Sequence, residues 1–583
     1  MSAVKSLVAD VLTWAQKPRS PAYSKLDTES DAEALRSPTP PMRKCLSTRL
    51  QKLSPKVMLA LIVPLLLFSG LLFAVSQTDI TGSRPKSLED GLAYLPSTTK
   101  GGSRRLRIIV PADSPSPDLC KMLMSALVSG YPSPVIVNWG RDFNKSPGWF
   151  GGSHLGKIDG ALDFLNAITS DDAPEDERLG PDDLVLIVDA YDIWFQLPPS
   201  ILIRRYLAQN YAADERIRKQ WSEFHSWFSF EARETNPTPR QSIIISTQKK
   251  CWPDASLGSD PHCDKLPESS ARKDMYGPHT DEDPEQIHDL RPRYVNSGSI
   301  IGPVGEMQRM LRRAQEKVVE KRAAGLDIFS DQGVFAEIFG EQEIWRTSKR
   351  NNHVEWIKNQ TEYPEAAAEE AQQFDFGIGL DYVQDLFTPT VFEEDDGLYV
   401  VLDEGSTLRD TAAERGIDPP RVNGIPEDMI GMRSPVEETG INTHLGWNKL
   451  PLYTDLWSTS VPVMVHHNAH RNGLKEERLR DWWKNNWFFP YLRQLLKLQA
   501  QPKKSLKPIL RIPGRDGVED LIYKAPEADA TKRRPRLFKK EDLKAKGLPE
   551  ATWDGLCKSE GHEEWWKGIF YDGSGPVDGE NST

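Results

Sequence analysis

The sequence has few cysteines and no excess of positive charge. Five cysteines among 583 residues are too few for a disulfide-rich scaffold, and no repeated CxxC spacing suggests a zinc site. The formal net charge of -12 provides no overall basic field of the kind that attracts nucleic acid. Internal repeats of fixed period are also absent, which excludes solenoids and propellers. A metal in this protein would therefore be held by carboxylates and histidines.

A long apolar run near the N-terminus predicts a membrane anchor. Residues 57–75 carry no charge and would span roughly 28 Å as a helix, which is enough to cross a bilayer. Five basic residues lie between positions 43 and 56, whereas Asp79 follows the run, so we expect a cytosolic N-terminal tail and a lumenal remainder. The alternative is a buried core helix, which the absence of a polar face disfavours.

This topology divides the chain into five regions. They are a disordered cytosolic tail (1–56), a transmembrane signal anchor (57–75), a flexible stem (76–103), a lumenal domain (104–475) and a helical and irregular C-terminal extension (476–583). An aromatic stretch at 478–498 is expected to form a helix that packs against the lumenal domain. A membrane-surface or acceptor-binding helix is the alternative for this stretch.

From residue 104 onward, short apolar runs alternate with helical patterns. Strands are predicted at 106–111, 134–139, 184–189 and 242–246, and helices at 119–129 and 157–168. This order predicts an α/β, Rossmann-like fold with a mostly parallel sheet flanked by helices. Ligands bind beyond the carboxyl ends of the strands in such sheets, so Asp189, Tyr191 and Asp192 follow a strand where chemistry is expected.

Two aspartates stand close together at the end of this predicted strand. Asp189 and Asp192 would repel each other unless a cation or hydrogen-bond donors compensate their charge, and a divalent metal is the natural compensation. The alternative is a turn in which one aspartate caps the following segment. The spacing alone leaves both interpretations open.

Seven short blocks of the chain carry motifs in a fixed order. They include W-x-GG followed by Lys in WFGGSHLGKIDGALDFL, D-x-Y-D in LVLIVDAYDIWF, NSG in RYVNSGSIIG, DQ in FSDQGVF and His-x-Asn in VMVHHNAHRNG. The blocks occupy residues 149–165, 184–195, 244–254, 293–302, 329–335, 376–387 and 463–473. Together they resemble the glycosyltransferase domain of the procollagen lysyl hydroxylases and its relatives. The resemblance covers roughly residues 104–474.

The resemblance implies a GT-A fold and the transfer of a hexosyl group, galactose or glucose, from a UDP-sugar. It also implies a metal held by Asp189, Asp192 and His466, and two carboxylates with one imidazole suit Mn²⁺. The late block reads His466-His467-Asn468-Ala469, in which His467 and Ala469 replace glycines of the family pattern. His467 therefore remains an alternative metal ligand.

Further roles follow from the same resemblance. Trp149 and Tyr191 would border the uridine, Lys157 would meet the diphosphate, and Asn468 belongs with these cofactor-binding residues. The segment Asn296-Ser297-Gly298 would lie at the sugar or acceptor. Asp331 and Gln332 are expected to open a helix capped by Ser330, with Asp331 as a candidate base. The catalytic set is therefore Asp331, Gln332 and Asn296.

A lumenal location has consequences for cysteine and asparagine residues. Cys251 and Cys263 are expected to form a disulfide, because the lumen is oxidising and the loop between them is short. Cys120 and Cys557 either pair with each other or stay free. The sequons at Asn359 and Asn581 predict a glycoprotein.

The resemblance implies a metal-dependent glycosyltransferase, and the apolar run with its flanking charges predicts a single-pass type II membrane protein of the Golgi or the endoplasmic reticulum. Its partners would be a UDP-sugar donor, a protein or glycan acceptor, and the lipid bilayer through residues 57–75, with no nucleic acid. One alternative is a catalytically inactive GT-A-fold binding or scaffolding module. Another is a transferase that uses a different nucleotide sugar, such as a GDP-sugar.

Overall fold

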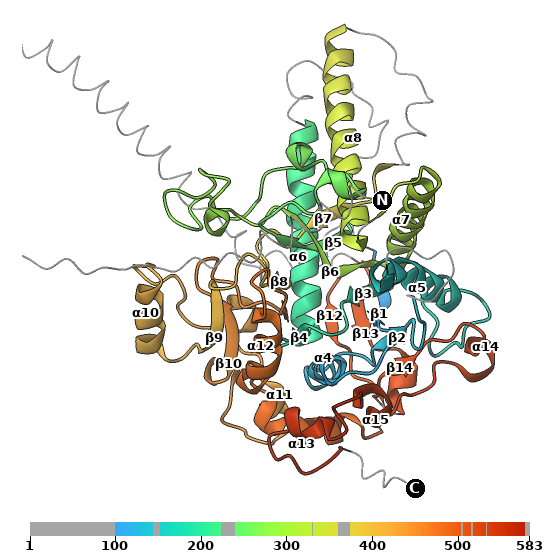
Figure 1. Ribbon diagram of the computed structural model, residues 1–583, viewed down its shortest axis with the longest axis vertical. Helices are drawn as coiled ribbons and strands as arrows, with labels where there is room; N and C mark the ends of the chain where they lie inside the picture. Colours follow the sequence, from blue (N-terminus) through green and yellow to red (C-terminus); the bar gives the residue numbers. More distant parts are fainter. Residues whose placement is uncertain are drawn as a thin grey trace, which may run out of the picture. The chain divides into compact units, whose positions relative to one another are not determined.

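A nine-stranded sheet forms the centre of the fold (Figure 1). The computed structural model describes residues 100–143, 152–222, 239–328, 330–359, 374–502, 505–514, 517–531 and 533–577. The strands of this sheet are β1 (Gly102–Pro111), β2 (Val135–Val137), β3 (Leu184–Val188), β5 (Ile243–Gln248), β6 (Tyr294–Pro303), β7 (Ile378–Leu380), β12 (Leu510–Ile512), β13 (Leu521–Lys524) and β14 (Arg536–Leu537).

Most pairs in this sheet are parallel. The main path runs β12-β13-β1-β3-β6-β5-β7, while β2 pairs with the later half of β1 and with β14. Strand β6 runs antiparallel to both β3 and β5, and β12 runs antiparallel to β13. The prediction of a mostly parallel α/β sheet is confirmed.

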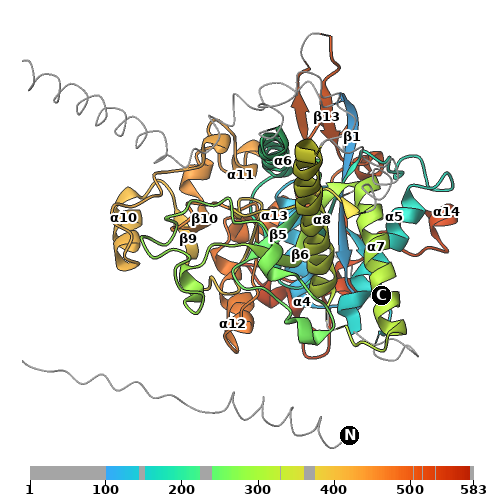
Figure 2. The same ribbon diagram turned by 90° about the horizontal axis from the view of Figure 1, so that it is seen from above.

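Helices cover both faces of the sheet because its central strands are apolar on both sides. In β3, Leu184, Leu186 and Val188 contact one hydrophobic cluster, whereas Val185 and Ile187 contact the other. The second cluster is covered by α5 (Gly152–Ile168), α7 (Val304–Ala323) and α8 (Asp331–Asn359). The first is covered by α4 (Pro117–Val128), α6 (Pro199–Ser222), α13 (Leu492–Gln499) and α15 (Trp553–Cys557). Figures 1 and 2 show α5 and α7 together on one side of the strands.

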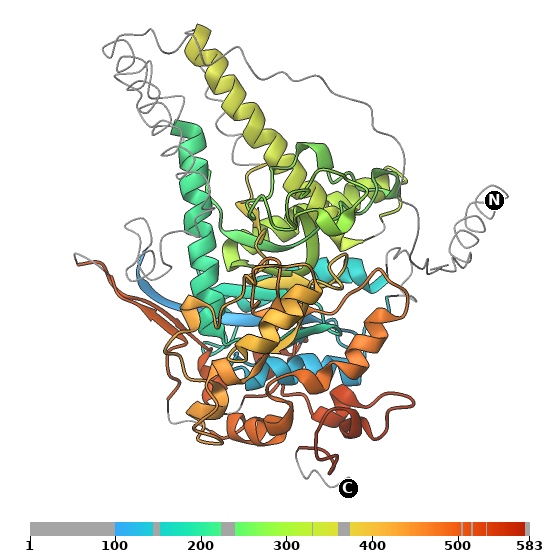
Figure 3. The ribbon, with the colours of Figure 1, turned by 90° about the vertical axis from the view of Figure 1, so that its left-hand side faces the viewer.

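Two smaller sheets lie beside the central one. The first has the order β4-β11-β8, from Ile193–Phe195, Met464–His466 and Phe387–Pro389, and the second pairs β9 (Gly397–Val401) with β10 (Pro451–Asp455). The remaining α-helices of the described residues are α10 (Gly405–Glu414), α11 (Pro435–Glu438), α12 (Leu474–Asp481) and α14 (Leu543–Lys546). Figure 3 shows the C-terminal ends of α6 and α8 projecting together beyond the sheet, where Arg350 donates a hydrogen bond to Gln220.

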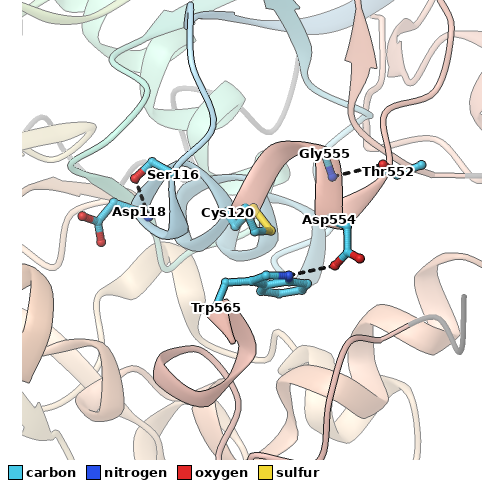
Figure 4. Close-up of a disulfide and its surroundings, with 8 residues drawn as sticks. Ser116, Asp118, Cys120, Thr552, Asp554, Gly555 and Trp565 are labelled. Atoms are coloured by element: carbon cyan, nitrogen blue, oxygen red, sulfur yellow. Dashed lines mark hydrogen bonds between the residues drawn. A yellow bond between two sulfur atoms is a disulfide. The ribbon is translucent and has the colours of Figure 1, made fainter. Parts of the chain in front are cut away.

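The last hundred residues join the central sheet. Strand β13 pairs in parallel with the start of β1, and β14 pairs in parallel with β2. A disulfide between Cys120 on α4 and Cys557 on α15 fastens the same region (Figure 4). Thr552 caps α15, as Ser116 caps α4. The stretch that the sequence set apart as a C-terminal extension thus completes one edge of the fold.

The predicted elements of the first half are confirmed with small shifts at their ends. The strands expected at 106–111, 134–139, 184–189 and 242–246 are β1, β2, β3 and β5, and the helices expected at 119–129 and 157–168 are α4 and α5. Cys251 and Cys263 form the expected disulfide. The prediction of one helix at 478–498 is wrong, because the chain forms α12, two short 3₁₀ turns and α13. Pro490 lies in the second turn, where it has no N–H to continue a helix.

Several predictions fall on residues outside the described part of the chain. These are the tail (1–56), the anchor (57–75), most of the stem (76–99), Trp149, and the side chains of the sequon residues Asn359 and Asn581. Within the part that the structure describes, no helix is both long enough and apolar enough to cross a membrane.

Candidate metal centre and its surroundings

The two aspartates and one of the two histidines meet at the carboxyl end of β3. Asp189 directly follows β3, and Asp192 directly precedes β4. Strand β11 pairs antiparallel with β4, so that His466 lies opposite Ile193. The Asp192 carbonyl accepts a hydrogen bond from the backbone N–H of His467, 2.7 Å away, which continues this pairing past the end of β11. Two segments that are far apart in sequence are thereby held together by backbone hydrogen bonds.

The side chains of these three residues converge. His466 Nε2 lies 3.2 Å from Asp192 Oδ2 and 3.9 Å from Asp189 Oδ2. One possible ligand atom from each residue lies within 4.8 Å of the others. Two carboxylate oxygens and one imidazole nitrogen form a donor set that suits Mn²⁺. The residues present therefore fit a divalent metal ion.

His467 lies elsewhere. Its ring is fully buried, with its centroid 4.0 Å from that of Trp194 and 5.9 Å from that of Trp482. Neither ring nitrogen has a hydrogen-bond partner among the described residues. Burial lowers the pKa of His467 well below its ordinary value, so the ring is neutral. Of the two histidines that the sequence left open, only His466 reaches the aspartates.

Lys157 connects the site to two helices. From α5, its Nζ lies 2.6 Å from Asp189 Oδ1 and 2.7 Å from Asp331 Oδ2, and it donates a hydrogen bond to the Ser297 carbonyl at 3.2 Å. Burial by itself would lower the pKa of Lys157, but the two carboxylates outweigh it and raise this pKa. An ammonium group has three N–H donors, so these contacts use all of them. In this structure Lys157 therefore fixes the positions of Asp189 and Asp331.

Asp331 and Gln332 open α8, and Ser330 accepts a hydrogen bond from the Gly333 N–H as the expected cap. Gln332 Oε1 accepts a hydrogen bond from the Ser297 N–H at 3.3 Å. Asp331 is almost fully buried. The start of α8 is thus attached both to Lys157 and to β6.

Strand β6, the antiparallel neighbour of β3, contacts the candidate metal ligands directly. The Asp189 N–H donates to the Gly298 carbonyl at 2.9 Å. Asn296 donates a hydrogen bond to Gln248 Oε1 at 2.9 Å, and its own Oδ1 accepts one from the Gly298 N–H at 3.1 Å. A Cβ atom at Gly298 would lie 2.4 Å from Nδ1 and Cε1 of His466, which is closer than any real contact. Gly298 therefore leaves room for the His466 ring.

Asn468 and Tyr191 border the centre on different sides. Asn468 Nδ2 lies 3.4 Å from His466 Nδ1, and Asn468 Oδ1 accepts a hydrogen bond from the Val391 N–H at 3.0 Å. The Tyr191 hydroxyl donates to the Ser114 carbonyl at 3.1 Å, just beyond the end of β1. Asn468 therefore supports the ring of His466, while Tyr191 is held over the neighbouring strand end.

Lys475 also reaches the site, although the sequence did not predict it there. This residue lies in the first turn of α12, and its Nζ is 2.6 Å from Asp192 Oδ2. Burial would raise the pKa of Asp192, but His466 and Lys475 hold it below its ordinary value. A lysine next to an exposed glycine turn carries no distinguishing pattern, so only the fold shows that it reaches the site.

The structure brings together nine of the predicted site residues. They are Asp189, Asp192, His466, Lys157, Asp331, Gln332, Asn296, Asn468 and Tyr191, and Trp149 lies outside the described residues. Neither a family model nor a curated protein matches this chain.

Proposed function

We propose that this protein is a metal-dependent glycosyltransferase of the GT-A type. It would transfer a hexosyl group, galactose or glucose, from a UDP-sugar to a protein or glycan acceptor. The observation that carries the proposal is the convergence of Asp189, Asp192 and His466 at the carboxyl end of a central strand. Open α/β sheets bind their ligands at this position.

The chemistry of sugar transfer matches this set of residues. A divalent ion held by Asp189, Asp192 and His466 would neutralise the charge of the diphosphate as the glycosidic bond breaks. Lys157 on α5 holds Asp189 in position through an ion pair, and Gly298 leaves the space that the His466 ring needs. Tyr191 presents a half-buried aromatic ring at the neighbouring strand end, where a base can stack.

The position of Asp331 bears on its proposed role as a base. Its carboxylate is buried and paired with Lys157, which fixes its orientation. The same lysine links it to Asp189. Because Lys157 holds both carboxylates, Asp331 would lie at a fixed distance from the metal ligand Asp189. Asp331 and the metal ligands could then act on the same bound substrate.

The test is nucleotide release by the full-length protein against a panel of UDP- and GDP-sugars, with Mn²⁺ or with chelator. Release from one UDP-sugar that chelator abolishes, and that Asp189→Asn and Asp192→Asn each reduce by at least a hundredfold, supports the proposal. Asp182→Asn is the matched control, because Asp182 lies on the surface just before β3. Release that is unaffected by the two site variants would contradict it.

A second candidate is a GT-A-fold binding module without turnover. The observation in its favour is that Lys157 and Lys475 already neutralise Asp189 and Asp192, as a purely structural ion-pair cluster would. Binding of Mn²⁺ and UDP without release from any donor would support this candidate. Preference for GDP over UDP in the same assay would instead point to a different nucleotide sugar.

The proposal includes a type II membrane protein of the Golgi or endoplasmic reticulum, anchored to the bilayer by residues 57–75. The two disulfides support an oxidising compartment. Protease protection of the folded domain in sealed microsomes would test this orientation. Digestion of the folded domain without detergent would contradict it.

A further inference from the structure

Two lysines contact the candidate metal centre, and their surroundings differ. The side chain of Lys157 is 7% exposed and its three donors are all engaged. The side chain of Lys475 is 41% exposed, and among the described residues its ion pair is with Asp192. Lys157 is therefore fixed, whereas Lys475 can leave its carboxylate without opening the core.

Lys475 occupies the oxygen that faces the other metal ligands. Asp192 Oδ2 lies 2.6 Å from Lys475 Nζ and 3.2 Å from His466 Nε2. A metal ion shared by Asp192 and His466 would use this same side of the carboxylate. An ammonium and a divalent cation cannot both lie against one carboxylate oxygen without strong repulsion, because both carry positive charge.

The exposed segment that precedes α12 leaves room for the Lys475 side chain to adopt another rotamer. Helix α12 begins directly after Gly473, which has φ +79°, and residues 470–473 are exposed. A lysine side chain on the first turn of a surface helix has several rotamers that keep its ammonium at the rim of the site. An anionic group bound beside the metal would be within reach of such a rotamer.

We propose that Lys475 is a tethered cation that competes with the divalent metal for Asp192 and, once displaced, binds the phosphates of the nucleotide ligand. This inference rests on the metal centre of the proposed function but not on turnover. Lys475 opposes the binding of metal alone and favours the binding of metal together with a nucleoside diphosphate. It makes the two ligands depend on each other.

The competition predicts effects of opposite sign from one substitution. The full-length Lys475→Met variant should bind Mn²⁺ alone at least about fivefold more tightly than the wild type. At saturating Mn²⁺, it should bind UDP at least about fivefold more weakly. A fivefold change is the lower end of the usual coupling between two binding sites. Lys475→Arg keeps the charge and should change both affinities less. Lys484→Met, at an exposed lysine just after α12, is the matched control and should change neither.

Calorimetric titration of Mn²⁺, and then of UDP at saturating Mn²⁺, measures both affinities. The thermal unfolding midpoint of each variant verifies that it is folded. Equal affinities in Lys475→Met and wild type, or a shift of both in the same direction, would overturn the inference while leaving the metal centre intact. If the wild type binds no Mn²⁺, and Asp192→Asn titrates identically, the proposed function fails, and the inference fails with it.

Discussion

Gly298 and His466 are in such close contact that one added methyl group does not fit between them. A Cβ atom at position 298 would lie 2.4 Å from two atoms of the imidazole ring, although the residues are far apart in sequence. Gly298 also receives the N–H of Asp189 on its carbonyl oxygen. The same residue therefore sets the positions of two of the three candidate metal ligands.

Gly298→Ala should displace the His466 ring and weaken metal binding. We expect the Mn²⁺ affinity to fall about 10- to 100-fold, as when other residues that support metal ligands are changed. Calorimetric titration of Mn²⁺ measures the effect. Gly405→Ala in α10 is the control, because a Cβ atom there meets only the end of the Arg409 side chain at 3.9 Å. An unchanged affinity in Gly298→Ala would show that the ring of His466 is not a ligand.

The two adjacent histidines should give separable effects. His466→Ala removes a candidate ligand and should abolish Mn²⁺ binding. His467→Ala keeps the ligand set but leaves a cavity beside Trp194, and should lower the free energy of unfolding by about 2–4 kcal/mol. Metal titration and chemical denaturation of both variants test this. The assignment would be reversed if His467→Ala lost the metal and His466→Ala kept it.

The two disulfides should differ in their contribution to stability. Cys120 and Cys557 are 437 positions apart, whereas Cys251 and Cys263 are 12 apart. In the chain-entropy model the longer loop gives the larger stabilisation, with about 2–5 kcal/mol typical of native disulfides. The double variant Cys120→Ala/Cys557→Ala should therefore unfold at lower denaturant than Cys251→Ala/Cys263→Ala. The opposite order would show that strain or residual structure outweighs loop length.

Asp381 should make stability depend on pH. It directly follows β7, and burial together with the nearby Asp385 raises its pKa from 3.8 to about 7. Between these values the folded protein holds a proton that the unfolded chain releases, so the free energy of unfolding falls as the pH rises. Relative to Asp381→Asn, the wild type should lose about 2 kcal/mol between pH 5 and pH 7.

Denaturant titrations of wild type and Asp381→Asn at both pH values test this expectation. The carboxylate accepts hydrogen bonds from the N–H groups of Leu386 and Phe387, and the amide oxygen of asparagine can accept them too. Asp182→Asn, at the surface, should follow the wild type. Parallel pH dependence of Asp381→Asn and wild type would place the pKa of Asp381 in its ordinary range.

The local pattern of the sequence was sufficient for the strands and for the position of the aspartates. An apolar run such as 184–188 can only be a buried strand or a short buried helix, and its length favours the strand. Residues that follow a central strand then lie at the ligand-binding edge of the sheet. Asp189 and Asp192 could be assigned to this edge from the sequence, because the assignment depends on neighbouring residues alone.

Other features were decided only by the tertiary structure. The choice between His466 and His467 depends on the pairing of β11 with β4, because successive residues of a strand point to opposite sides. Lys475 and the strands β13 and β14 reach their positions through contacts between segments that are hundreds of residues apart. Such pairings depend on the packing of the whole fold, so the residues on either side of Lys475 do not predict them.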